Sequence, residues 1–128
     1  MPEATVILFD NSEFMRNGDY IPSRLGAEVD TVGMIAQAKC DANPENTVAI
    51  VAASGRPNVV LTLTPDVARV FTSTDKIPIV GTVDFINSFH VATVCSLFSA
   101  SVVVTWDSLH PYRCVFHVFC CVLVNSFY

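Results

Sequence analysis

Three short apolar runs in the first half of the chain predict β-strands. Residues 5–10 and 47–52 consist almost entirely of β-branched and other apolar side chains, which is typical of strands buried on both faces in a parallel sheet. Residues 58–64 form a third such run, separated from the second only by the turn around Gly55-Arg56-Pro57. A connection this short cannot cross over a sheet, so the second and third runs are expected to form an antiparallel hairpin.

Apolar spacing of three to four residues predicts helices between and after the strands. Residues 23–40 show this period, and Asn43-Pro44 ends it. Residues 65–72 predict a short helix with Pro65 in its first turn. Residues 83–98 are apolar on more than one side, which predicts a buried helix. The order of elements is typical of the first half of a doubly wound α/β domain, with a central parallel sheet and one antiparallel edge strand.

The chain is apolar and poor in charged residues, and this composition argues against one class of partner. Of its 128 residues 52% are hydrophobic and 15% are charged, with a formal net charge of −5. Residues 91–128 contain only two charged side chains, Asp107 and Arg113. Because no cluster of Lys or Arg is present to displace phosphate counterions, a nucleic-acid partner is not expected.

No targeting segment is expected, and a membrane span is disfavoured. The N-terminus has no basic region, and the apolar run 6–9 is too short for a signal peptide. Residues 85–106 are uncharged and long enough to cross a bilayer, but eight of these 22 residues are polar. A form tethered to a membrane by this segment therefore remains an alternative only. The five Cys residues are an odd number and predict free thiols in a reducing compartment.

Asp10 and Ser12 are the candidate metal-binding residues. They follow the first strand, at the edge of the sheet where ligands of open α/β folds bind, and they begin an Asp-x-Ser-x-Ser arrangement that can supply oxygen ligands to Mg²⁺. The next position of this arrangement is Phe14, which cannot coordinate a metal. We therefore expect no metal, and expect Asp10 and Ser12 to organise their loop by hydrogen bonds.

The remaining candidates for chemistry favour structural roles. The sequence has no glycine-rich phosphate loop, nucleophile elbow or His-Glu-x-x-His motif, so neither an enzyme nor a cofactor is expected. His90 lies in an apolar segment and is expected in the core. A zinc site is disfavoured in the last part of the chain, because the paired Cys-x-x-Cys spacing is missing. The His and Cys residues concerned are His110, Cys114, His117, Cys120 and Cys121.

Residues 10–20, followed by Pro22-Ser23-Arg24, closely resemble the opening of the von Willebrand A domain in the ubiquitin-receptor subunits (non-ATPase subunit 4) of the proteasome regulatory particle. Residues 43–48, 62–66 and 81–94 fit the same family in order and spacing. Glu13 and the aromatic residue after it, in place of Ser, are characteristic of these subunits.

The resemblance implies a Rossmann-like von Willebrand A fold and a non-enzymatic scaffold role in ubiquitin-dependent protein degradation. The domain would dock in the regulatory particle, help to hold its lid to its base, and be found in the cytoplasm and nucleus. The loop after the first strand would then be part of the docking surface. Its residues are Asp10, Asn11, Ser12, Glu13, Arg16, Asn17 and Asp19.

The resemblance covers about residues 3–94. We expect a partial von Willebrand A domain over 1–94 and a divergent, apolar, Cys-rich tail over 95–128, which we interpret as an alternative or truncated C-terminus. The family's ubiquitin-interacting helices have no counterpart here, so polyubiquitin binding is not implied. A metal-dependent, adhesion-type ligand-binding domain is the alternative function.

Two segments of the tail have apolar patterns that suggest secondary structure. Residues 101–106 are expected to pair in parallel beside the first strand, whose edge would otherwise be exposed, and to end at Asp107. Residues 114–124 fit a strand and a helix equally well.

Overall fold

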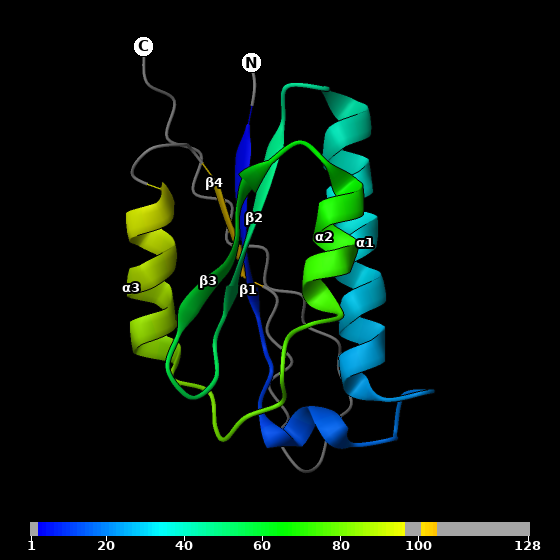
Figure 1. Cartoon of the computed structure of the whole chain (residues 1–128), viewed down its shortest axis with the longest axis vertical. Coiled ribbons are helices and arrows are strands. Elements are labelled where there is room, and N and C mark those ends of the chain that lie inside the picture. Colours follow the sequence, from blue (N-terminus) through cyan, green and yellow to red (C-terminus); the bar gives the residue numbers. More distant parts are fainter. Residues whose placement is uncertain (1–2, 97–100, 105–128) are drawn as a thin grey trace.

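A four-stranded mixed sheet with helices on both faces is seen in the computed structural model, which describes residues 3–96 and 101–104 (Figure 1). The elements in chain order are β1 (Ala4–Phe9), the 3₁₀ helix η1 (Glu13–Arg16), α1 (Arg24–Ala42), β2 (Thr47–Ala52), β3 (Asn58–Thr64), α2 (Val67–Thr74), α3 (Phe85–Ser96) and β4 (Ser101–Val104).

The strand order is β3-β2-β1-β4, with β1 at the centre of the parallel part. β1 pairs in parallel with β2, where Ala4 lies opposite Thr47, and with β4, where Thr5 lies opposite Ser101. β2 and β3 form the predicted antiparallel hairpin. The predicted fold class and the predicted pairing of a late strand with β1 are thus confirmed. The predicted end of that strand at Asp107 and the segment 114–124 lie outside the described residues.

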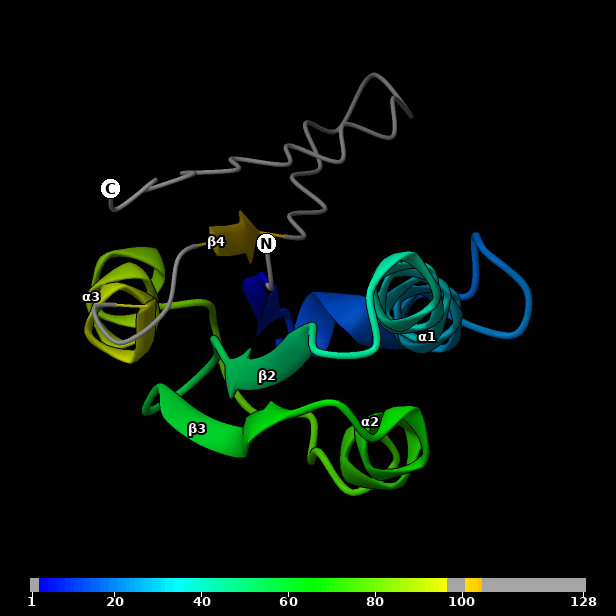
Figure 2. The ribbon, with the colours of Figure 1, turned by 90° about the horizontal axis from the view of Figure 1, so that it is seen from above.

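Both faces of β1 are buried, as its unbroken apolar sequence predicts. α1 and α2 lie on one face of the sheet and α3 on the other (Figure 2). Successive residues of a strand point to opposite faces, so Ile7 and Phe9 join the core under α1 and α2, whereas Val6 and Leu8 join the core under α3. β1 therefore anchors both hydrophobic layers.

Capping side chains set where α1 and α2 begin. Ser23 accepts a hydrogen bond from the backbone N–H of Gly26 at 3.1 Å, so α1 starts at the next residue, Arg24. Asp66 accepts one from the N–H of Ala68 at 2.9 Å. Because Asp66 is the cap, Pro65 lies outside α2, and the helix begins two residues later than the sequence predicts.

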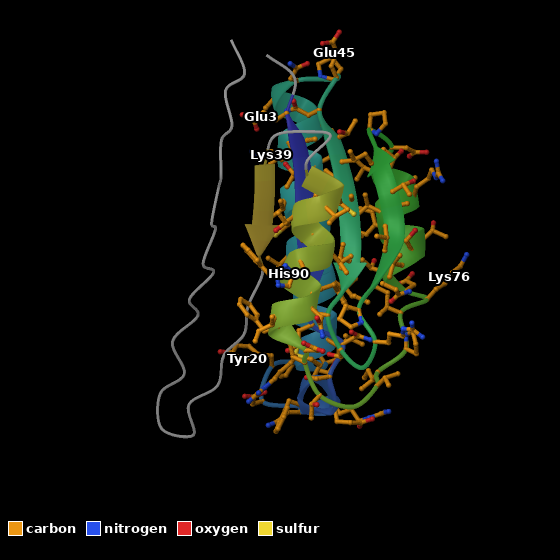
Figure 3. All side chains as sticks on the ribbon, turned by 90° about the vertical axis from the view of Figure 1, so that its left-hand side faces the viewer. Glu3, Tyr20, Lys39, Glu45, Lys76 and His90 are labelled. Atoms are coloured by element: carbon orange, nitrogen blue, oxygen red, sulfur yellow. The ribbon has the colours of Figure 1, made fainter. Side chains whose placement is uncertain are left out.

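The predicted burial of the helix at 83–98 is wrong for one side of α3. Ala92 and Ser88 are fully buried against the sheet, but Ile86 is 69% and Val94 60% exposed. A helix that packs against one face of a sheet buries only the stripe that faces it, and lack of charge on the other side does not change this. His90 is likewise exposed rather than a core residue (Figure 3). Within the described residues, no helix has the length and hydropathy required to span a bilayer.

Candidate functional site

Three loops meet where β1 and β2 end, at the lower end of the molecule in Figure 1. They are the segment from Asp10 through η1, the turn between β2 and β3, and the loop between α2 and α3. Backbone hydrogen bonds join them: the N–H of Glu13 donates to the carbonyl of Gly81 at 2.9 Å, and the N–H of Gly55 donates to that of Thr82 at 3.0 Å. This is the edge at which ligands of open α/β sheets bind.

Asp10 organises the first of these loops, as the sequence predicts. Its Oδ1 accepts hydrogen bonds from the backbone N–H of Ser12 at 2.8 Å and from the hydroxyl of Ser54 at 3.2 Å. Its own N–H donates to Oε1 of Glu28 on α1 at 2.9 Å. The carboxylate therefore ties the end of β1 to the end of β2 and, through its backbone, to α1.

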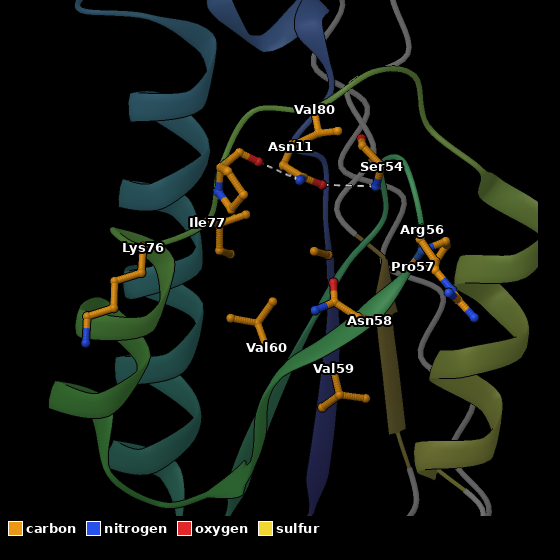
Figure 4. A pocket seen from close by; sticks show the side chains of 12 residues that line it. Asn11, Ser54, Arg56, Pro57, Asn58, Val59, Val60, Lys76, Ile77 and Val80 are labelled. Atoms are coloured by element: carbon orange, nitrogen blue, oxygen red, sulfur yellow. Dashed lines mark hydrogen bonds between the residues drawn. The ribbon is translucent and has the colours of Figure 1, made fainter.

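Asn11 joins all three loops and is only 3% exposed. Its side-chain nitrogen donates to the carbonyl of Pro78 at 2.7 Å, and its side-chain oxygen accepts from the backbone N–H of Ser54 at 3.0 Å (Figure 4). Its backbone carbonyl accepts from the N–H of Val80 at 2.8 Å. Because both the nitrogen and the oxygen of the side-chain amide form hydrogen bonds with backbone groups of other loops, Asn11 fixes the relative positions of the loops.

The side chains after Asp10 do not fit a complete metal site. The Ser12 hydroxyl is fully buried and has no hydrogen-bond partner among the described residues, so it offers one oxygen. Phe14, at the position of the next oxygen ligand, is 69% exposed and offers none. Asp10 already accepts two hydrogen bonds through the same oxygen. Mg²⁺ requires a nearly complete octahedron of oxygen ligands, and no group of three or more His, Cys, Asp or Glu gathers in the described part of the chain.

A rim of mostly exposed residues, which we define as residues 13–21, surrounds these buried anchors; within it Met15 is buried and Tyr20 is half-buried. Arg16 pairs with Glu13 at 2.6 Å, and Arg24 donates from two nitrogens to the two carboxylate oxygens of Asp19, each at 2.7 Å. The hydrogen bond from Arg24 lowers the pKa of the Asp19 carboxyl, and the hydrogen bond to Glu13 raises the pKa of Arg16. Ile21 is 96% exposed at the end of the rim.

The predicted docking residues thus divide into two groups. Asp10, Asn11 and Ser12 are buried and shape the loop, whereas Glu13, Arg16, Asn17 and Asp19 are exposed on the rim. Local sequence could not separate them, since all seven are polar and neighbouring.

A groove of about 640 Å³ lies beside Asn11 and was not predicted (Figure 4). It combines the start of β3 and the turn before it with the loop after α2, which lies about 20 residues later in the sequence. The sequence Gly55-Arg56-Pro57 predicts a turn between two strands, but it does not predict that Arg56 lines a groove. The lining residues are Asn11, Ala52, Ser54, Arg56, Pro57, Asn58, Val59, Val60, Lys76, Ile77, Pro78 and Val80.

The mixed sheet, with helices on both faces and loops gathered at its carboxyl edge, is an open α/β architecture. A family model described as von Willebrand factor type A domain matches residues 5–104, from β1 through β4. The chain belongs to this family.

Two curated relatives that match the chain are named as proteasome subunits, which confirms the resemblance seen in residues 10–24. The chain is 40% identical over 91 residues to the 26S proteasome non-ATPase regulatory subunit 4 of Dictyostelium discoideum, covering 70% of this chain and 26% of that protein. It is 42% identical over 91 residues to the 26S proteasome regulatory subunit rpn10 of Schizosaccharomyces pombe, covering 70% of this chain and 37% of that one. The match therefore spans only about a quarter to a little over a third of these relatives.

A solved structure agrees with this assignment. The crystal structure of the SpRpn10 VWA domain superposes with a TM-score of 0.76 at 33% identity, over 88% of this chain and 64% of that one. The division of the chain at residue 94 stays a prediction.

Proposed function

We propose that this chain is a non-enzymatic docking module of the 26S proteasome regulatory particle that serves ubiquitin-dependent protein degradation. Its partners would be lid and base subunits of the particle, and it would act in the cytoplasm and nucleus. The family and the names of the similar proteins support this proposal. The observation that carries it is the exposed rim at residues 13–21, held in shape by buried anchors beneath it.

The rim has the composition of a protein-binding surface. Phe14 and Ile21 are exposed apolar side chains between charged groups, and protein interfaces combine apolar anchors with a polar surround. The ion pair between Arg24 and Asp19 holds one side of the rim, and Asn11 holds its base. A surface ordered before binding loses less conformational entropy on association, which favours docking by this loop.

The proposal gives the chain neither a catalytic nor a polyubiquitin-binding role. Of the polar side chains at the carboxyl edge, Asp10 and Asn11 are engaged with backbone groups, and the Ser12 hydroxyl is fully buried. We propose no polyubiquitin-binding role for these 128 residues, because the sequence is not expected to contain the ubiquitin-interacting helices of the family.

Co-sedimentation with regulatory particles that lack their own subunit 4 tests this proposal. The tagged full chain is expected to sediment with the particle, and Phe14→Asp and Ile21→Asp are each expected to reduce the bound fraction at least about tenfold, because a buried charge would replace an apolar anchor. Met34→Asp is the matched control, since Met34 is an apolar side chain of α1 that is 73% exposed and outside the rim. Failure of the wild-type chain to associate overturns the function, and normal association of both rim variants overturns the role of the rim.

A further inference from the structure

The groove beside Asn11 has a cationic residue on each of two sides and an apolar floor. Figure 4 shows Arg56 and Lys76 on opposite sides of it, with Asn58 and Val60 between them. Ile77, which is buried, forms part of the floor. These residues come from the turn before β3, from β3 itself and from the loop after α2, so the tertiary fold creates the combination.

The two cations of the groove are available for an incoming acid. Three of the cations in the described residues, Arg16, Arg24 and Lys39, form ion pairs with carboxylates. Arg56 and Lys76 are exposed, and neither forms an ion pair within the described part of the chain. In a chain whose net charge is −5, an exposed cation on each side of the groove can attract a carboxylate at that side.

The lining favours a peptide over other anions. A nucleic acid needs more phosphate contacts and aromatic faces for stacking, and no aromatic residue lines the groove. A lone phosphate is far smaller than about 640 Å³ and would leave Val60 and Ile77 without contact. An extended peptide can place carboxylates at both sides, apolar side chains on the floor, and its backbone near the exposed amide of Asn58.

We propose that this groove binds an extended acidic peptide segment of a partner protein, with its carboxylates on Arg56 and Lys76. This goes beyond the proposed function, because the groove is separate from the rim at residues 13–21 and would accept its ligand whether or not the rim docks. Asn11 lies beneath both surfaces, and its two side-chain hydrogen bonds keep the walls of the groove in place.

Fluorescence anisotropy with a labelled peptide of alternating Glu and Val tests the proposal on the full chain. Arg56→Glu and Lys76→Glu are each expected to weaken binding about fivefold or more, since each replaces an attraction by a repulsion. Arg69→Glu is the matched control: Arg69 is an exposed cation of α2 outside the groove, and its reversal changes the net charge equally. It is expected to weaken binding less than about twofold.

Three results would overturn the proposal. The wild-type chain could bind the acidic peptide with a dissociation constant above about 1 mM. A peptide of alternating Gln and Val could bind equally well, which would remove the role of the carboxylates. Arg69→Glu could weaken binding as much as the groove variants, which would mean long-range attraction without a site. All three substitutions are at exposed positions, and circular dichroism checks that each variant keeps the wild-type fold.

Discussion

Replacing Asn11 by Ala should destabilise the domain more than any surface change, because it removes both side-chain hydrogen bonds through which Asn11 joins the loops. The N–H of Ser54 would then be left in a buried position without its acceptor, and the carbonyl of Pro78 in a partly buried one. A buried donor left unpaired costs about 1–3 kcal/mol, and a partly hydrated acceptor costs about 1 kcal/mol or less. Water reaching Pro78 reduces the second loss, so we expect a total of about 2–3 kcal/mol.

The expected loss is large enough to measure on the full chain. Counting only the roughly 100 residues that the structure describes, the unfolding entropy is about 0.2 kcal/mol/K, so the melting temperature should fall by roughly 10–15 °C. Urea titration followed by far-UV circular dichroism gives the free energy of unfolding directly. Asn17→Ala is the control, because Asn17 is exposed on the rim and its replacement should change stability by less than about 0.5 kcal/mol. If Asn11→Ala also stays within about 0.5 kcal/mol of the wild type, the amide does not hold the loops and the reasoning is wrong.

Three further predictions concern other parts of the fold. Gly55→Ala and Gly81→Ala should each lower the free energy of unfolding by about 1 kcal/mol, measured in urea, because both glycines have positive φ, 69° and 53°; unchanged urea midpoints would contradict this. Burial, and then the charge of Asp41, raise the pKa of the Cys40 thiol. Alkylation of Cys40 at pH 8, followed by peptide mass spectrometry, should therefore be slower in the native protein than in urea. Equal rates would show that the fold does not lower the reactivity of this thiol. The hydrogen bond and charge of Lys39 lower the pKa of Glu3 from 4.5, so their pair stabilises the fold above that pH and its contribution is lost as the pH falls below it. Lys39→Met should raise the pKa of Glu3 in a carboxyl NMR titration and make stability less dependent on acid pH, and an unchanged titration would disprove the pairing.

Much of the fold was predictable because its signals are local. The apolar runs at β1 and β2 identify strands buried on both faces, and β2 is observed at the predicted residues, Thr47–Ala52. The helix period identifies α1, and Ser23 marks its start. The expected strand at 101–106 is confirmed as β4 over Ser101–Val104, beside β1.

The candidate site was predictable only in part. Asp10 lies at the end of β1 in any parallel sheet, so its place at the carboxyl edge followed from the strand alone. Its loop-organising hydrogen bonds also agree with the known behaviour of Asp in turns. The groove was missed because Arg56 and Lys76 belong to different connections, and no spacing rule relates them. The exposure of His90 was missed because an uncharged helix looks the same in sequence whether it packs on one side or on several.

The sequence by itself determined the strands, the helices to within about two residues at each end, and the family, since these depend on periodicity and on the residues of one loop. The tertiary structure decided which of the neighbouring polar residues are buried and hold the loops together, and which are exposed on the surface. Asn11 is buried and Glu13 is exposed two residues later, because backbone from two other loops closes over the former and not the latter. The physical reason is that burial and hydrogen-bond partners are properties of segments that meet in space, and here those segments lie more than 40 residues from Asn11 along the chain.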